Sequence, residues 1–190
     1  MAIARSCVSK VEKRCFSIVK SLESASYCTP KTPARDTLDV WPALPLLVDG
    51  STTSTTTMDN IIVALKQSNR VRKVDLWYLV DWKLEKVLTA MQVPFPQLTV
   101  LELTAPYDEM LPVISIPDSF LGGSAPRLQD FELSSIPFPG LPNLLLSATH
   151  LVRLHLHDIP HSGYISPEAM AVVLSALSSL ESLTLRFRSP

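Results

Sequence analysis

A short apolar string, written LxxLxL with x for any residue, recurs along this chain and constrains its fold more than any other feature. Its first, fourth and sixth positions are Val71-Val74-Leu76, Leu98-Leu101-Leu103, Leu128-Phe131-Leu133, Leu151-Leu154-Leu156 and Leu180-Leu183-Leu185. The copies begin 27, 30, 23 and 29 residues apart, and a degenerate copy with Leu44 and Leu47 begins 27 residues before Val71. A recurrence of this length indicates a chain built from stacked structural repeats.

The residues in and before each string predict one strand and one helix per repeat. The last two apolar residues of the string alternate with other residues, as on the inward face of a short strand. Ten and seven residues before each string lie further apolar residues at helical spacing, with Asp118 as the polar exception. Ser166 and Pro167 form a helix start signal, whereas the segment from Pro117 to Gly123 is long enough for one turn only.

One helix and one strand cannot bury their apolar faces alone, but stacked units share a continuous core. We therefore predict an α/β leucine-rich-repeat solenoid with a curved parallel sheet on the concave side and helices on the convex side. The strands are expected at Lys73–Leu76, Val100–Leu103, Asp130–Leu133, Arg153–Leu156 and Ser182–Leu185.

Composition narrows the classes of function. With 190 residues, 46% of them hydrophobic and 18% charged, the chain suits a single folded domain. A net charge of −1 argues against nucleic-acid binding, and the absence of any run of 18 apolar residues argues against a membrane helix. The 3 cysteines form no CxxC pair, which favours a reducing intracellular setting, cytoplasmic or nuclear. A mitochondrial transit peptide in the basic N-terminal segment is the less favoured alternative.

The sequence contains no recognisable catalytic motif. It lacks GxSxG, HExxH and phosphate-loop patterns, so neither an enzymatic activity nor a cofactor is expected. His155 and His157 lie two apart on a predicted strand and point to the same face, as two metal ligands would. Because Asp158 faces the other way and no cysteine is near, solvated surface histidines are favoured over a metal site.

The exposed strand residues form the candidate surface for a protein ligand that the sequence does not identify. They occupy the third and fifth positions of each string and the position after it. The candidate binding residues are Asp75, Trp77, Glu102, Asp130, Glu132, Arg153, His155, His157 and Arg186. Acidic groups lie on the first three repeats and basic groups on the last two, while Trp77 is an exposed aromatic anchor at one end. An ordinary polar face that keeps the protein soluble is the alternative.

From residue 28 to residue 190 the chain resembles a large fungal family of F-box/leucine-rich-repeat proteins. The matching phrases are "DNIIVALKQSNRV", "LEKVLTAMQVPFPQLTVLEL", "VISIPDSFLGGSAPRLQ", "GLPNLLLSATHLVRLHL", "IPHSGYISPEAMAVVLSALSSLESLTL" and "FRSP". In that family an N-terminal F-box binds the Skp adaptor of a cullin ubiquitin ligase, and the repeats are taken to capture the protein to be ubiquitinated. The resemblance therefore implies a substrate-recognition module.

The chain departs from the family at both ends. Residues 1–27 do not resemble an F-box, although Val8, Val11, Cys15, Ile18 and Leu22 share one helix face. We expect an amphipathic helix or a disordered extension there, followed by a leucine-rich-repeat domain over 28–190 that is truncated at its C-terminus. The alternatives are a stand-alone interaction module and a fragment without ligase coupling. The Skp adaptor is expected as a partner only of a longer form that carries an F-box.

Overall fold

The structure is a computed structural model that describes residues 26–28, 38, 44–51, 58–106 and 114–188. The predicted N-terminal helix face lies outside the described residues. Within the described part, no helix is long and apolar enough to cross a membrane.

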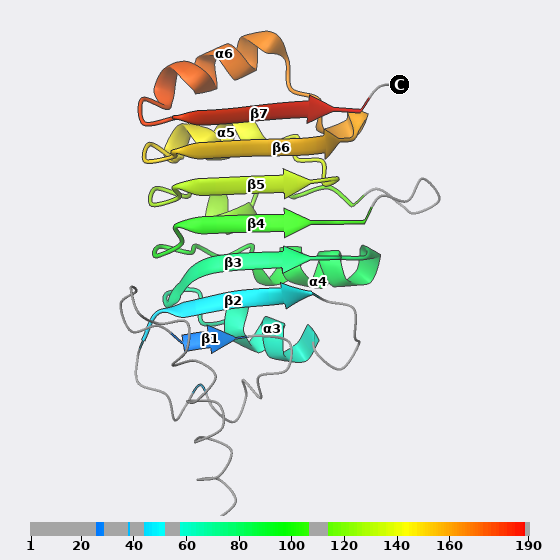
Figure 1. The fold of residues 1–190 in the computed structure, drawn as a ribbon, viewed down its shortest axis with the longest axis vertical. Coiled ribbons are helices and arrows are strands. Elements are labelled where there is room, and N and C mark those ends of the chain that lie inside the picture. Colours follow the sequence, from blue (N-terminus) through cyan, green and yellow to red (C-terminus); the bar gives the residue numbers. More distant parts are fainter. Residues whose placement is uncertain (1–25, 29–37, 39–43, 52–57, 107–113, 189–190) are drawn as a thin grey trace, which may run out of the picture.

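In the part of the chain that the structure describes, seven parallel strands form one sheet, and their order in the sheet is their order along the chain (Figure 1). The strands are β1 (Ser26–Cys28), β2 (Leu46–Ser51), β3 (Val71–Trp77), β4 (Val100–Thr104), β5 (Asp130–Ser134), β6 (Arg153–Ile159) and β7 (Ser182–Phe187). Each of the five predicted strands lies within one of them, from β3 to β7. The predicted α/β class and parallel sheet are confirmed.

Short helices connect most of the strands. They are α3 (Met58–Leu65), α4 (Asp81–Ala90), α5 (Leu141–Ser147) and α6 (Pro167–Ala176), with 3-10 turns η2 (Phe120–Gly123) and η3 (His161–Gly163). The expected helix start is confirmed, because the Ser166 hydroxyl accepts a hydrogen bond of 3.2 Å from the Ala169 amide. In Figure 1, α3, α4 and α5 lie behind the sheet, and no described helix covers the near face of β3 to β7.

One apolar core lies between the sheet and its helices. The fourth and sixth residues of the strings in β3 to β6 point into it and are almost fully buried, as Leu101 and Leu154 illustrate. The upstream helical residues meet them from the other side, including Ile61, Leu88 and Leu144. Asp118, the polar exception in the pattern, is exposed. Burial of one face only leaves the other sheet face polar and available.

The N-terminal strands differ from the prediction. Strand β1 begins at Ser26, so the sheet begins just before the expected domain boundary at residue 28. In β2, Val48 pairs with Val74 whereas Leu47 pairs with Lys73, so the degenerate copy read from Leu44 and Leu47 is one residue out of register. Leu47 therefore faces the polar side, because neighbouring strand residues alternate between faces.

Non-glycine residues with left-handed backbone mark the carboxyl ends of several strands. Tyr78, Ser135 and Asp158 have positive φ angles of 65°, 62° and 51°. This conformation is unfavourable for residues other than glycine, so it requires support from the surrounding structure. Part of that support is the hydrogen bond of 3.0 Å that the Ser135 amide donates to the carbonyl of His157 in the adjacent strand.

Candidate functional site

The register of the sheet aligns the predicted surface residues in rows that cross the strands. One row is Lys73, Val100, Asp130, Arg153 and Ser182, and the next is Asp75, Glu102, Glu132, His155 and Thr184. Neighbouring strands lie about 4.8 Å apart, so side chains in a row are in reach of one another. We call this surface of β2 to β7 the polar face.

The third predicted row is interrupted. Thr104, Ser134 and His157 are paired as expected, but the register between β6 and β7 shifts after Leu156. The pairing resumes at Ile159 with Phe187, so Arg186 does not pair with His157. The prediction that this row continues to Arg186 is therefore wrong, because the register between β6 and β7 is irregular after Leu156.

Strands β2 to β4 carry an acidic cluster on the polar face, formed by Asp49, Asp75 and Glu102 around Lys73. The Lys73 Nζ lies 2.9 Å from the Asp75 carboxylate. Partial burial, followed by the charge of Asp75, raises the pKa of both Asp49 and Glu102. Burial lowers the pKa of Lys73, but its hydrogen bond to Asp75 and the surrounding carboxylates outweigh that effect and raise it. One lysine thus lies among three carboxylates, which leaves this cluster acidic.

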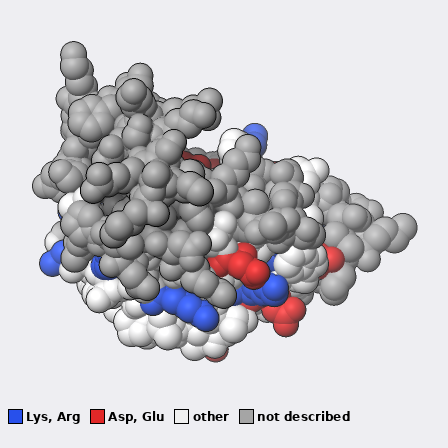
Figure 2. Space-filling view, turned by 90° about the horizontal axis from the view of Figure 1, so that it is seen from below, with Lys and Arg blue, Asp and Glu red and all other residues white. Residues whose placement is uncertain are grey.

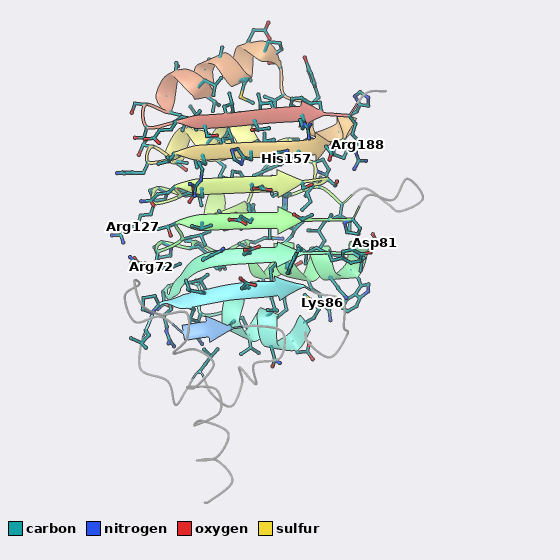
Figure 3. The ribbon with its side chains drawn as sticks, viewed as in Figure 1. Arg72, Asp81, Lys86, Arg127, His157 and Arg188 are labelled. Carbon is teal, nitrogen blue, oxygen red and sulfur yellow. The ribbon has the colours of Figure 1, made fainter. Side chains whose placement is uncertain are left out.

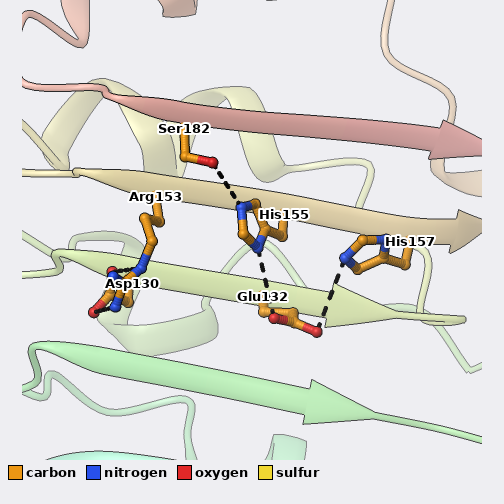
Figure 4. Close-up of polar contacts among 6 residues, drawn as sticks. All are labelled: Asp130, Glu132, Arg153, His155, His157 and Ser182. Atoms are coloured by element: carbon orange, nitrogen blue, oxygen red, sulfur yellow. Dashed lines mark hydrogen bonds and ion pairs between the residues drawn. The ribbon is translucent and has the colours of Figure 1, made fainter.

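Strands β5 and β6 pair charges of opposite sign. Arg153 contacts both carboxylate oxygens of Asp130, with Nε at 2.7 Å from one and a terminal guanidinium nitrogen at 2.7 Å from the other (Figure 4). Glu132 faces His155 and His157 from the neighbouring strand. The acidic residues of β5 therefore lie against groups of β6 that can carry positive charge. The acidic character expected for three repeats is concentrated on β2 to β4.

Exposed aromatic side chains lie at and just beyond the carboxyl end of β3. Trp77 is 55% exposed and follows the inward-facing Leu76, so it belongs to the polar face. Tyr78 and Trp82 are 58% and 40% exposed and were not among the predicted residues. The sequence pattern could not indicate them, because both lie beyond the single position after the string: Tyr78 is in the turn, and Trp82 is in the first turn of α4.

Charges elsewhere on the molecule are of both signs. Figure 3 places Arg72 and Arg127 beside the amino ends of the strands, and Asp81 and Lys86 beside the carboxyl ends. The described surface seen from below likewise shows basic and acidic groups (Figure 2). On the described surface visible in that view, positive and negative side chains are mixed, whereas carboxylates predominate in the acidic cluster on the polar face.

Two buried features among the described residues, an apolar cavity and the Cys28 thiol, do not suit covalent catalysis. A small cavity between sheet and helices is lined by apolar residues and glycine, namely Leu133, Ile136, Phe138, Leu141, Leu156, Ile159, Gly163 and Ile165. Burial raises the pKa of the Cys28 thiol to about 11, despite the opposing effect of Arg70, so the reactive thiolate is scarce at neutral pH. The polar face is therefore the candidate functional site, as a binding surface.

Comparison with known proteins gives no match from which a function could be assigned. No protein-family model, no curated protein and no solved structure matches the chain.

Proposed function

We propose that this chain is a leucine-rich-repeat solenoid that binds a protein ligand on its polar face, which is the concave side. The proposal rests on the recurrence of a strand string at intervals of 23 to 30 residues together with parallel strands in chain order. In such an architecture each unit contacts its neighbours, and the row of strands forms an extended concave surface.

The observation that carries the binding role is the uncovered polar face itself. Its residues are aligned in register across five strands, and no described helix packs on it (Figure 1). An open row of strands suits an extended macromolecule better than a small molecule, which usually occupies a concave pocket. Trp77 supplies an aromatic side chain of the type that is enriched in interface hot spots.

The charge of the acidic cluster defines the ligand chemistry. The raised pKa values of Asp49 and Glu102 reflect the cost of holding carboxylates close together in a partly buried setting. A lysine- or arginine-rich segment placed against them relieves that repulsion and gains charge-assisted hydrogen bonds. We therefore propose a partner with a basic segment opposite β2 to β4 and an apolar pocket for Trp77.

The resemblance to F-box/leucine-rich-repeat proteins supports a specific setting for this binding. In that setting the ligand is a protein destined for ubiquitination, and a longer form with an F-box contacts the Skp adaptor. The alternative proposal is a stand-alone interaction module without ligase coupling. Co-purification of the Skp adaptor with the longest transcript product, lost when its F-box is deleted, distinguishes the two.

The binding role is tested by site-specific photo-crosslinking. A benzoylphenylalanine at position 104 on the polar face, next to the acidic cluster, is compared with one at position 143, which is exposed on α5. We expect a defined crosslinked protein at position 104 and none at 143. The same product from both positions, or no product from either, would contradict a ligand site on the polar face.

The charge of the ligand is tested with the crosslinked partner. Asp75→Lys combined with Glu102→Lys is expected to weaken its affinity about tenfold or more and to flatten the salt dependence. The matched control is Glu85→Lys combined with Glu168→Lys, which makes the same change in net charge at exposed helix positions. Equal affinities of the two double variants would show that net charge, not the acidic cluster, governs binding.

A further inference from the structure

Glu132, His155 and His157 converge at one point on the polar face (Figure 4). Glu132 and His155 are direct register partners on β5 and β6, and His157 follows two residues later on the same side of β6. One ligand atom from each side chain lies within 4.8 Å of the other two. All three side chains stand on strands, so the backbone holds them in a fixed relation.

The distances within this cluster are close to those of a metal site. The Nδ1 of His155 lies 3.7 Å from one carboxylate oxygen of Glu132, and the Nε2 of His157 lies 3.9 Å from the other. Ligand atoms about 2.1 Å from a tetrahedral zinc ion are separated by roughly 3.4 Å. With one ligand atom per residue the separations are at most 4.8 Å. They therefore exceed the zinc value by at most roughly 1.4 Å, and binding requires the three side chains to move closer together.

Ser182 orients one of the two imidazoles. Its hydroxyl lies 3.0 Å from the Nε2 of His155, on the opposite side of the ring from Glu132. A hydrogen bond from Nε2–H to this hydroxyl leaves the lone pair of Nδ1 directed at Glu132. Metal-binding histidines are commonly oriented in this way by an acceptor on the other ring nitrogen.

The surroundings of the cluster are electrostatically favourable for a cation. Asp130 neutralises Arg153, the nearest arginine on the same strand as the two histidines, through a two-point contact. Glu102 is the register partner of Glu132 on β4 and adds a further carboxylate next to the cluster. The local charge is therefore not dominated by the basic residue of β6.

We propose that Glu132, His155 and His157 bind a divalent transition-metal ion of the zinc class on the polar face. Two imidazoles and one carboxylate suit zinc and its neighbours better than magnesium or calcium, which prefer oxygen ligands. Three protein ligands leave a coordination position for water or for a donor from a bound partner. This site goes beyond the proposed protein binding and does not depend on it.

The test is a calorimetric titration of the full chain with zinc chloride, in a Cys7→Ser, Cys15→Ser background that removes two competing thiols. We expect one ion per chain, with affinity reduced at least tenfold by Glu132→Gln and by His157→Ala. Ser182→Ala removes an orienting group and should weaken binding by about tenfold. His161→Ala, an exposed histidine outside the cluster, is the matched control and should leave the affinity unchanged.

A second measurement identifies the coordinating atoms. Long-range proton–nitrogen spectra of the histidines should show zinc-dependent shifts at Nδ1 of His155 and Nε2 of His157, with His161 unaffected. Circular dichroism melting of each variant establishes that folding is retained. Zinc binding of equal affinity in the parent, Glu132→Gln and His157→Ala proteins would overturn the site, as would the absence of binding in the parent.

Discussion

Strands β6 and β7 carry the same apolar string and yet differ in burial. In β6 the string residues Leu154 and Leu156 are 0% and 1% exposed, whereas in β7 Leu183 is 41% exposed and Leu185 is only half-buried. Among the described strands, β6 pairs on both sides, whereas β7 lies at the edge of the sheet and pairs with β6 alone. The apolar string therefore defines which face a residue occupies, while the neighbouring strands determine how deeply that residue is buried.

The largest expected effect on stability comes from shortening a buried side chain of the apolar string in β6. Leu154→Ala removes a fully buried side chain and should lower the free energy of unfolding by about 2–5 kcal/mol. The equivalent change in β7, Leu183→Ala, should cost about 1 kcal/mol or less because that side chain is already partly in water. Urea denaturation of both variants measures the difference, and equal losses would contradict the comparison.

The second largest expected effect on stability comes from a substitution at Gly163, where the segments that follow β5 and β6 are in close contact. A Cβ atom at Gly163 would lie 2.8 Å from both Cγ2 of Ile159 and Cα of Pro137. Since the backbone of Pro137 cannot move freely, Gly163→Ala should destabilise the fold by about 1–3 kcal/mol. Ser162→Ala, at the exposed neighbouring position, serves as the control in thermal melts and should have little effect.

The open edge of β7 predicts self-association. Among the described residues, β7 has a strand partner on one side only, and Leu183 and Phe187 add exposed apolar surface. Leu183→Lys should reduce light scattering at high protein concentration while changing the unfolding free energy by less than about 1 kcal/mol. Unchanged scattering in this variant would locate the association surface elsewhere.

The smallest expected effect concerns Glu102. Burial first, and then the neighbouring Asp75, raise its pKa above the ordinary value of 4.5, so the folded state binds this proton more readily than the unfolded chain. The contribution of Glu102 to stability therefore decreases as the pH rises from about 4.5 through the raised pKa. Glu102→Gln should raise the unfolding free energy at pH 7 by about 0.5 kcal/mol or less. The gain should vanish at low pH in paired melting curves, and a gain that persists there would contradict this explanation.

The repeat pattern predicted the strands of the interior because each string offers a single apolar register. It failed at β2, where Leu44, Leu46, Leu47 and Val48 are all apolar and fit two registers equally well. Strand β1 has only three residues and no apolar string, so its own sequence does not predict a strand. Its place in the sheet is evident only from its pairing with β2.

The polar face was predictable as a set of rows, but its contacts were not. The alignment already placed Glu132 beside His155 in one row. The sequence does not contain the side-chain directions that bring His157 to the same carboxylate, or the hydrogen bond between His155 and Ser182. The same holds for the register shift, which is an irregularity of β6 between Leu156 and Ile159.

The order of the strands has a consequence for how the molecule comes apart. Because strand order equals chain order, β7 can detach without first separating any other pair of strands. Local opening should therefore start at this edge and advance inward, strand by strand. Amide hydrogens of β7 should exchange with deuterium fastest and those of β4 and β5 slowest, giving a graded rather than uniform protection along the chain.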